Sequence, residues 1–162
     1  MRLALLLLLT LLLVSCGFMR APPSYDPEDA DFIRETGTAS LSGTAAFPTP
    51  DGPVSCAGRA VSLIPASRYA RAVVRRDFGS ARGGRAEAVD AARVTHPAAF
   101  RFDQKTALCD AEGRFAFVGI ADGTYYVVAE ILWAGDGVLP EGGVLAERVR
   151  IRRGRNARVV LG

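Results

Sequence analysis

The sequence predicts an all-β fold, a sandwich of antiparallel strands. Three features of its 162 residues indicate this class. Short apolar runs alternate with polar positions, turns rich in Gly, Asp and Pro separate them, and helical patterns are missing between most of them. The stretch 110–130 is the clearest case, because two apolar runs, 115–118 and 125–133, flank a glycine-bearing turn.

The other strands follow from the same alternation. We expect strands at 38–47, 59–65, 115–118, 125–133, 144–152 and 157–161, with a cluster of turn residues at 48–53. Pro65 ends the second strand because it has no amide hydrogen to donate to a neighbour. Phe115 and Phe117 lie two residues apart, so both side chains point to one face of their strand, which we assign to the core.

Residues 66–104 depart from this pattern and are expected to be a partly helical or irregular insertion. Tyr69 and Val73 are four residues apart and Gly79 follows, which predicts a helix that ends there. A strand that continues past Pro65 is the alternative. Residues 80–85 are expected to be a flexible break, and residues 86–94 a short helix.

The first 15 residues have the pattern of a secretory signal, with Arg2 before an apolar stretch too short to span a bilayer. Leu13 and Ser15 then precede Cys16, and this order resembles the bacterial lipobox. The resemblance implies that Cys16 becomes the first mature residue and carries acyl chains such as palmitate. It therefore implies anchoring to the bacterial cell envelope, and Gly17 favours the outer membrane, facing the periplasm. The alternatives are an ordinary signal peptide with a chance cysteine at its end, or a buried core helix.

Residues 16–37 are expected to be a flexible tether, and residues 38–162 the folded domain. Prolines and acidic residues dominate the tether and few side chains could be buried. Phe32 and Ile33 leave open an ordered arm that lies on the domain.

Once Cys16 is set aside, the remaining pair of cysteines is Cys56 and Cys109. An even pair in an exported chain predicts a disulfide. A metal site or a reactive thiol is the alternative, but the chain has one histidine and no second cysteine at metal-ligand spacing. We therefore expect no metal and no cofactor. The single histidine, His96, is expected in an exposed loop.

Arginines alternate along the strand near the C-terminus, at Arg148, Arg150 and Arg152. The simplest interpretation is that these arginines lie on the solvent-exposed face of a sheet whose other face is buried. The alternative is a patch for anionic surfaces such as lipid headgroups, lipopolysaccharide or cell-wall polymer. The net charge of +3 is mild, and nucleic acid is not an expected partner of an exported chain.

The motif at the centre of the chain consists of Asp110, Gly113, Phe115, Phe117, Ile120, Gly123 and Tyr125. It resembles the carboxypeptidase regulatory-like domain, a transthyretin-like sandwich, over residues 38–162. The resemblance implies Greek-key topology. A hydrolase of 5-hydroxyisourate shares this fold, but it relies on several histidines and a C-terminal Tyr-Arg-Gly-Ser, which this chain lacks, so no catalytic residue is expected.

These observations lead to an expected function: a lipid-anchored cell-envelope protein whose non-catalytic sandwich has a structural or binding role. Its partners would be the membrane, through the N-terminal lipid, and an envelope protein or polysaccharide. Two alternatives remain at this stage. One is an assembly lipoprotein of an envelope-spanning secretion complex, and the other is a carbohydrate- or peptide-binding module.

Overall fold

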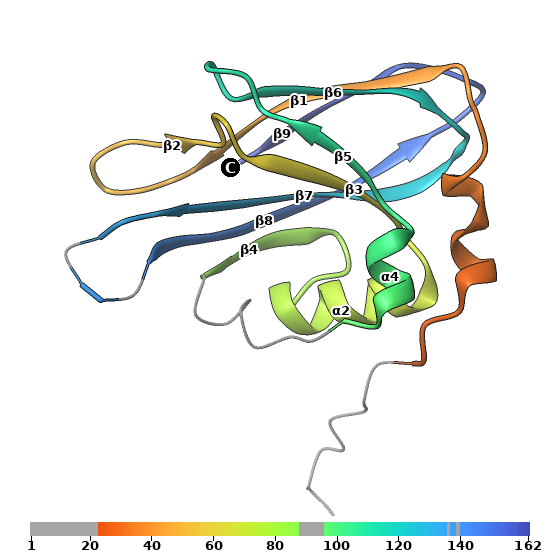
Figure 1. Ribbon diagram of the computed structural model, residues 1–162, viewed down its shortest axis with the longest axis horizontal. Helices are drawn as coiled ribbons and strands as arrows, with labels where there is room; N and C mark the ends of the chain where they lie inside the picture. The colour runs from red at the N-terminus through yellow and green to blue at the C-terminus, as the bar shows by residue number, and fades with distance from the viewer. Residues whose placement is uncertain (1–22, 88–95, 136, 139) are drawn as a thin grey trace, which may run out of the picture.

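The computed structural model describes residues 23–87, 96–135, 137–138 and 140–162 (Figure 1). In chain order the elements are η2 (Pro27–Ile33), β1 (Ala39–Phe47), β2 (Val54–Ser55), β3 (Ala60–Pro65), α2 (Arg68–Phe78), β4 (Gly83–Glu87), α4 (Ala98–Phe102), β5 (Lys105–Leu108), β6 (Arg114–Ile120), β7 (Gly123–Trp133), β8 (Glu141–Ile151) and β9 (Ala157–Leu161). Within these residues, no helix is both long enough and apolar enough to cross a membrane.

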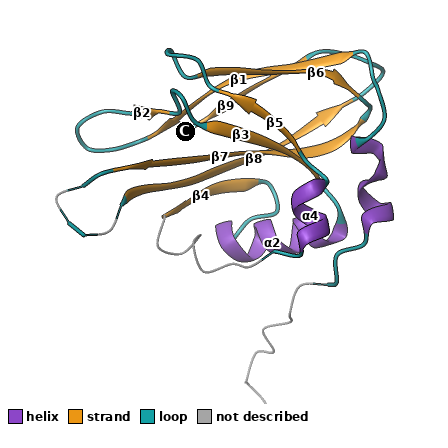
Figure 2. Cartoon of the chain, in the orientation of Figure 1, coloured by secondary structure: helices purple, strands orange, loops and turns teal. Residues whose placement is uncertain are grey.

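Two facing sheets make up the domain, and the predicted all-β sandwich is confirmed (Figure 2). One sheet has five antiparallel strands in the order β4-β8-β7-β3-β5. In the other sheet, β1 pairs antiparallel with β2 and β6 and parallel with β9. The parallel pair arises because the chain passes from one sheet to the other between β8 and β9.

The core lies between the sheets and contains the predicted aromatic residues. Phe115 and Phe117 are each only 4% exposed, and Tyr125 is fully buried. The Tyr125 hydroxyl donates a hydrogen bond to the Ala121 carbonyl at 2.9 Å, so the polar tip is satisfied. Burial also raises the pKa of Tyr125, to about 12.

Helices α2 and α4 cover the outer face of the five-stranded sheet (Figure 2). The predicted helix after Pro65 is confirmed. Ser67 caps its start by accepting the Ala70 amide at 3.1 Å, and Gly79 ends it at a φ of 67°, a conformation that side-chained residues avoid. Tyr69 and Tyr126 belong to the small second core beneath these helices.

The expected flexible break at 80–85 is wrong for residues 83–85, whereas residues 80–82 form a turn. Gly83 and Gly84 begin strand β4, which pairs with β8 at the edge of the sheet. At Gly83 a Cβ atom would lie 2.1 Å from the Ala146 carbonyl oxygen, so only glycine allows this approach. Residues 86–87 of the expected short helix belong to β4, and residues 88–94 lie outside the described residues.

The expected flexible tether at 16–37 is wrong for residues 27–33, which form the 3₁₀ helix η2. The ordered arm left open by the sequence is the state observed. Ile33 is buried in the main core, and the Phe32 ring meets the Tyr125 ring edge-on with centroids 5.2 Å apart. Arg34 also bonds to buried Asp103 at 2.6 Å. This apolar burial offsets the entropy of ordering the arm. The leader 1–15 and Cys16 lie outside the described residues.

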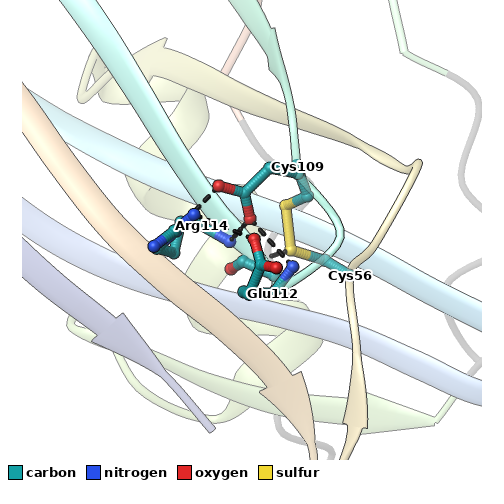
Figure 3. Close-up of polar contacts among 6 residues, drawn as sticks. Cys56, Cys109, Glu112 and Arg114 are labelled. Atoms are coloured by element: carbon teal, nitrogen blue, oxygen red, sulfur yellow. Dashed lines mark hydrogen bonds and ion pairs between the residues drawn. A yellow bond between two sulfur atoms is a disulfide. The ribbon is translucent and has the colours of Figure 1, made fainter.

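The turn between β5 and β6 lies beside the disulfide (Figure 3). Asp110 accepts the backbone amides of Glu112 at 3.0 Å and Arg114 at 2.8 Å, and Gly113 takes a φ of 75°. The Arg114 amide and guanidinium bonds hold the pKa of the Asp110 carboxyl below its usual value. Asp110 therefore builds a turn.

Candidate functional site

The predicted site residues do not come together in one place. Cys56 and Cys109 form the predicted disulfide, with Cα atoms 5.8 Å apart. Arg148, Arg150 and Arg152 are exposed, whereas Ile151 is buried, so the alternation predicted along β8 is confirmed. A role for these arginines in binding anions stays a prediction.

A cleft is lined by residues of the β1–β2 loop, the end of β4 and the β7–β8 hairpin. Figure 1 shows the β1–β2 loop and this hairpin at the same end of the sandwich. We call the cleft the Trp133 cleft. Its volume is about 560 Å³, within the usual range for small-molecule sites. The side chains that define its chemistry are Phe47, Thr49, Arg85, Glu87, Trp133 and Glu141.

Trp133 is the last residue of β7 and pairs across the sheet with Glu141, the first residue of β8. Its indole Nε1 donates to the Glu141 carboxylate at 3.2 Å, and its ring meets the Phe47 ring edge-on with centroids 5.8 Å apart. At Gly142, a Cβ atom would come within 2.8 Å of the indole ring. The missing side chain at Gly142 therefore lets the indole lie close to β8, half-buried and with one part facing the cleft.

Two charged side chains project into the cleft from β4. Arg85 and Glu87 are two residues apart, so they leave the strand on the same face. The Arg85 guanidinium lies over the Phe47 ring, 5.7 Å from its centroid. Neither side chain forms an ion pair with another residue of the described part of the chain. Within the described residues, no ion pair competes with a ligand for either side chain.

The cleft thus combines an indole with donors and acceptors of hydrogen bonds. The indole ring offers an apolar face on which a ring with axial C–H groups can stack. Carboxylates at Glu87 and Glu141 accept hydrogen bonds from hydroxyls, and the Arg85 guanidinium donates them. Trp133 also lines a second hollow of about 410 Å³, so a ligand longer than one ring could pass along the hairpin.

A further hollow, of about 420 Å³, lies between the helices and the five-stranded sheet. Two of its polar groups are already engaged. Asp77 pairs with Arg76 at 2.6 Å, and His96 Nδ1 lies 3.0 Å from the Tyr69 hydroxyl. Most of the other lining side chains are apolar, so this hollow is less suited to a polar ligand than the Trp133 cleft.

His96 lies in a loop, as expected, but the expectation that it is exposed is wrong. His96 is half-buried and its ring packs on the Phe100 ring, with centroids 4.9 Å apart. Burial disfavours the charged imidazolium and lowers the pKa of His96 below its usual value.

This burial predicts a dependence of stability on pH. Because the unfolded chain binds the His96 proton more readily than the folded chain, the free energy of unfolding should fall as pH falls through the usual histidine range. We expect His96→Gln to remove this part of the dependence. Urea unfolding of both proteins near pH 7.5 and pH 5.5 measures it. The same loss of stability in both proteins would contradict the prediction.

The sequence analysis did not find the cleft residues. Trp133 was assigned only as the end of a strand, although it is the single tryptophan of the chain. Arg85 fell in the expected break, and Glu87 in the expected helix. No periodicity joins Thr49, Arg85 and Glu141, because three separate loops and strands bring them to the cleft.

Comparison with known proteins supports the fold. No protein-family model matches the sequence, and no curated protein sequence matches it either. Among solved structures, a candidate carbohydrate-binding protein from Pseudomonas aeruginosa matches with a TM-score of 0.69 and 21% sequence identity, over 87% of this chain and 99% of its own. At this identity the match shows a shared fold.

A second solved structure, a DUF3823 family protein from Parabacteroides merdae, matches with a TM-score of 0.39 and 10% identity. The match covers 78% of this chain and 46% of the other. This similarity is too low to add to the fold assignment.

Proposed function

We propose that this protein is a non-catalytic carbohydrate-binding protein of the bacterial cell envelope, held to the membrane by an acyl group on Cys16. The binding site is the Trp133 cleft, and the ligand is a polysaccharide or an oligosaccharide. We also keep the carboxypeptidase regulatory-like domain as the proposed family of residues 38–162.

The observation that carries the proposal is a half-buried indole in one cleft with Arg85 and Glu87, neither of which forms an ion pair with another described residue. A pyranose has an apolar face and a rim of hydroxyls, and it needs both kinds of group. The solved structure from Pseudomonas aeruginosa adds support, because carbohydrate binding is the activity proposed for a protein of the same fold.

Intrinsic fluorescence tests the proposal directly. The chain has a single tryptophan, Trp133, so every change in indole emission reports on the cleft. Titration with neutral and acidic oligosaccharides of bacterial envelopes should change the emission in a saturable way with at least one glycan. A screen that covers these classes and finds neither an emission change nor a thermal shift would overturn the proposal.

The anchor is tested separately through Cys16. Because a thioether-linked lipid and its acyl chains hold the mature chain in the bilayer, we expect Cys16→Ala to abolish acylation and the membrane association that depends on it. Metabolic labelling with a palmitate analogue, followed by extraction of membranes at high salt, measures both. Labelling of the variant at the level of the wild-type protein would contradict the assignment.

A further inference from the structure

We infer that a second surface of this protein, the outer face of the helical layer, binds a membrane surface that contains anionic phospholipids. The basic face, as we call it, consists of Arg71 and Arg75 on α2, Arg101 and Phe102 on α4, and Arg148 on β8. It lies on the outer side of the five-stranded sheet, away from the small sheet (Figure 1).

Three arginines of the basic face lie near Tyr126. Arg148 lies directly opposite Tyr126 in the pairing of β7 with β8, so both side chains leave the sheet on the helical side. Burial raises the pKa of Tyr126, and the positive charges of Arg148, Arg71 and Arg75 oppose this rise. Although α2 and β8 are distant in sequence, their arginines therefore lie near the same tyrosine.

Two acidic residues near this face are engaged by other arginines. Asp77 is bonded to Arg76 at 2.6 Å, and Asp29 is bonded to Arg68 at 2.7 Å. None of the four arginines of the basic face forms an ion pair with another described residue. The face therefore presents positive charge that a layer of phosphate groups can complement.

Phe102 adds an apolar contact to the charged one. It is the last residue of α4 and is 85% exposed, whereas Phe100 on the same helix is buried in the second core. Packing of the helix therefore depends on Phe100 and does not require Phe102. An exposed aromatic beside arginines is the pairing that interfacial segments use to enter the headgroup region.

The N-terminal arm leaves the domain beside this face. The Tyr25 ring packs edge-on against the Tyr69 ring of α2 and the Phe100 ring of α4, with centroids 5.7 Å and 5.5 Å apart. Cys16 lies nine positions before Tyr25, and an extended chain of nine steps spans at most about 32 Å. This step rests on the proposed acylation of Cys16. With that anchor, the helical layer stays within reach of the bilayer.

The Trp133 cleft then lies to one side of the docked face, beyond the helical layer. Strand β7 runs from the helical layer at Tyr126 to Trp133, seven residues and about 23 Å further along. Figure 1 shows η2 at one end of the domain and the β7–β8 hairpin at the other. If the basic face is docked on the membrane, the Trp133 cleft therefore remains open to solvent.

Quenching by brominated lipids tests both the contact and the orientation. The full protein is added to vesicles of phosphatidylcholine, alone or mixed with phosphatidylglycerol, that contain brominated chains. In a Trp133→Phe background, Phe102→Trp places the reporter on the basic face. We expect strong quenching of this reporter only with phosphatidylglycerol, and little quenching of native Trp133 with either lipid. If the acyl anchor alone held the protein on the vesicles, quenching of the reporter would be the same with both lipid compositions.

Two double variants distinguish an effect of the basic face from an effect of the net charge of the protein. Arg75→Gln with Arg148→Gln should weaken docking to the anionic vesicles by about 30-fold, from the attraction expected of two arginines near such a surface. Arg155→Gln with Arg158→Gln removes the same charge from exposed positions outside the basic face and should change docking by less than about threefold.

Three outcomes would overturn the inference: equal quenching of the Phe102→Trp reporter in both kinds of vesicle, equal loss in the two pairs of variants, or strong quenching of native Trp133. Circular dichroism confirms that each variant is folded. Glycan binding at Trp133 is measured on the same proteins without vesicles, so the failure of one proposal is distinguished from the failure of the other.

Discussion

Replacing Cys56 and Cys109 with serine is expected to lower the free energy of unfolding by about 4 kcal/mol. The bond links residues 53 apart in the sequence, and opening it restores the entropy of a long loop to the unfolded chain. It also ties the strand regions of β2 and β5, which lie in different sheets. Urea unfolding of the variant and of the wild-type protein measures the difference.

A reductant provides the control for this prediction. Wild-type protein unfolded in the presence of a reductant should show the same loss as the double variant, and the reductant should leave the variant unchanged. Alkylation of denatured, oxidised protein should label neither Cys56 nor Cys109. Two labelled thiols, or a loss below about 1 kcal/mol, would contradict a stabilising bridge.

Trp133→Ala is expected to weaken the binding of the best glycan by about 30- to 100-fold, the range typical of a central aromatic contact. The substitution removes the stacking surface and the hydrogen bond that orients the Glu141 carboxylate. Because the variant has no tryptophan, isothermal titration calorimetry replaces fluorescence as the measurement.

Phe102→Ala is the matched control, since it removes an exposed aromatic outside the cleft and should leave glycan affinity unchanged. Trp133 packs partly on the core, so the melting temperature of the variant is measured as well. Glu87→Gln removes only a charge from an exposed side chain and should weaken binding by about tenfold. Full glycan affinity in both cleft variants would place the site elsewhere.

The stretch 110–130 shows which structural features can be predicted from residues that are close together in the sequence. The alternation of Phe115 and Phe117 assigned their faces correctly, because a strand has a period of two and the apolar face must be buried. The helix before Gly79 was predicted for a similar reason, since its apolar spacing and its stop signal both lie within one short segment. The disulfide followed from the number of cysteines in an exported chain.

The predictions that were wrong concern segments whose structure depends on contacts with distant parts of the chain. Strand β4 carries glycines and charged residues, and it becomes a strand because β8 offers it an edge to pair with. The arm around Phe32 and Ile33 is polar on average, and it is ordered because the domain provides a cavity for two apolar side chains. His96 is buried by contacts with Tyr69 and Phe100, which a loop composition does not predict.

By itself, the sequence determined the fold class, the paired cysteines and the alternating faces of most strands, because these depend on residues close together in the chain or on simple counts. Tertiary structure alone decided the Trp133 cleft and the basic face. Each gathers side chains from three or more elements, and a group such as Arg85 or Arg148 acquires its neighbours only when distant strands and helices pack together. Sites of this kind depend on relative position, which no local pattern encodes.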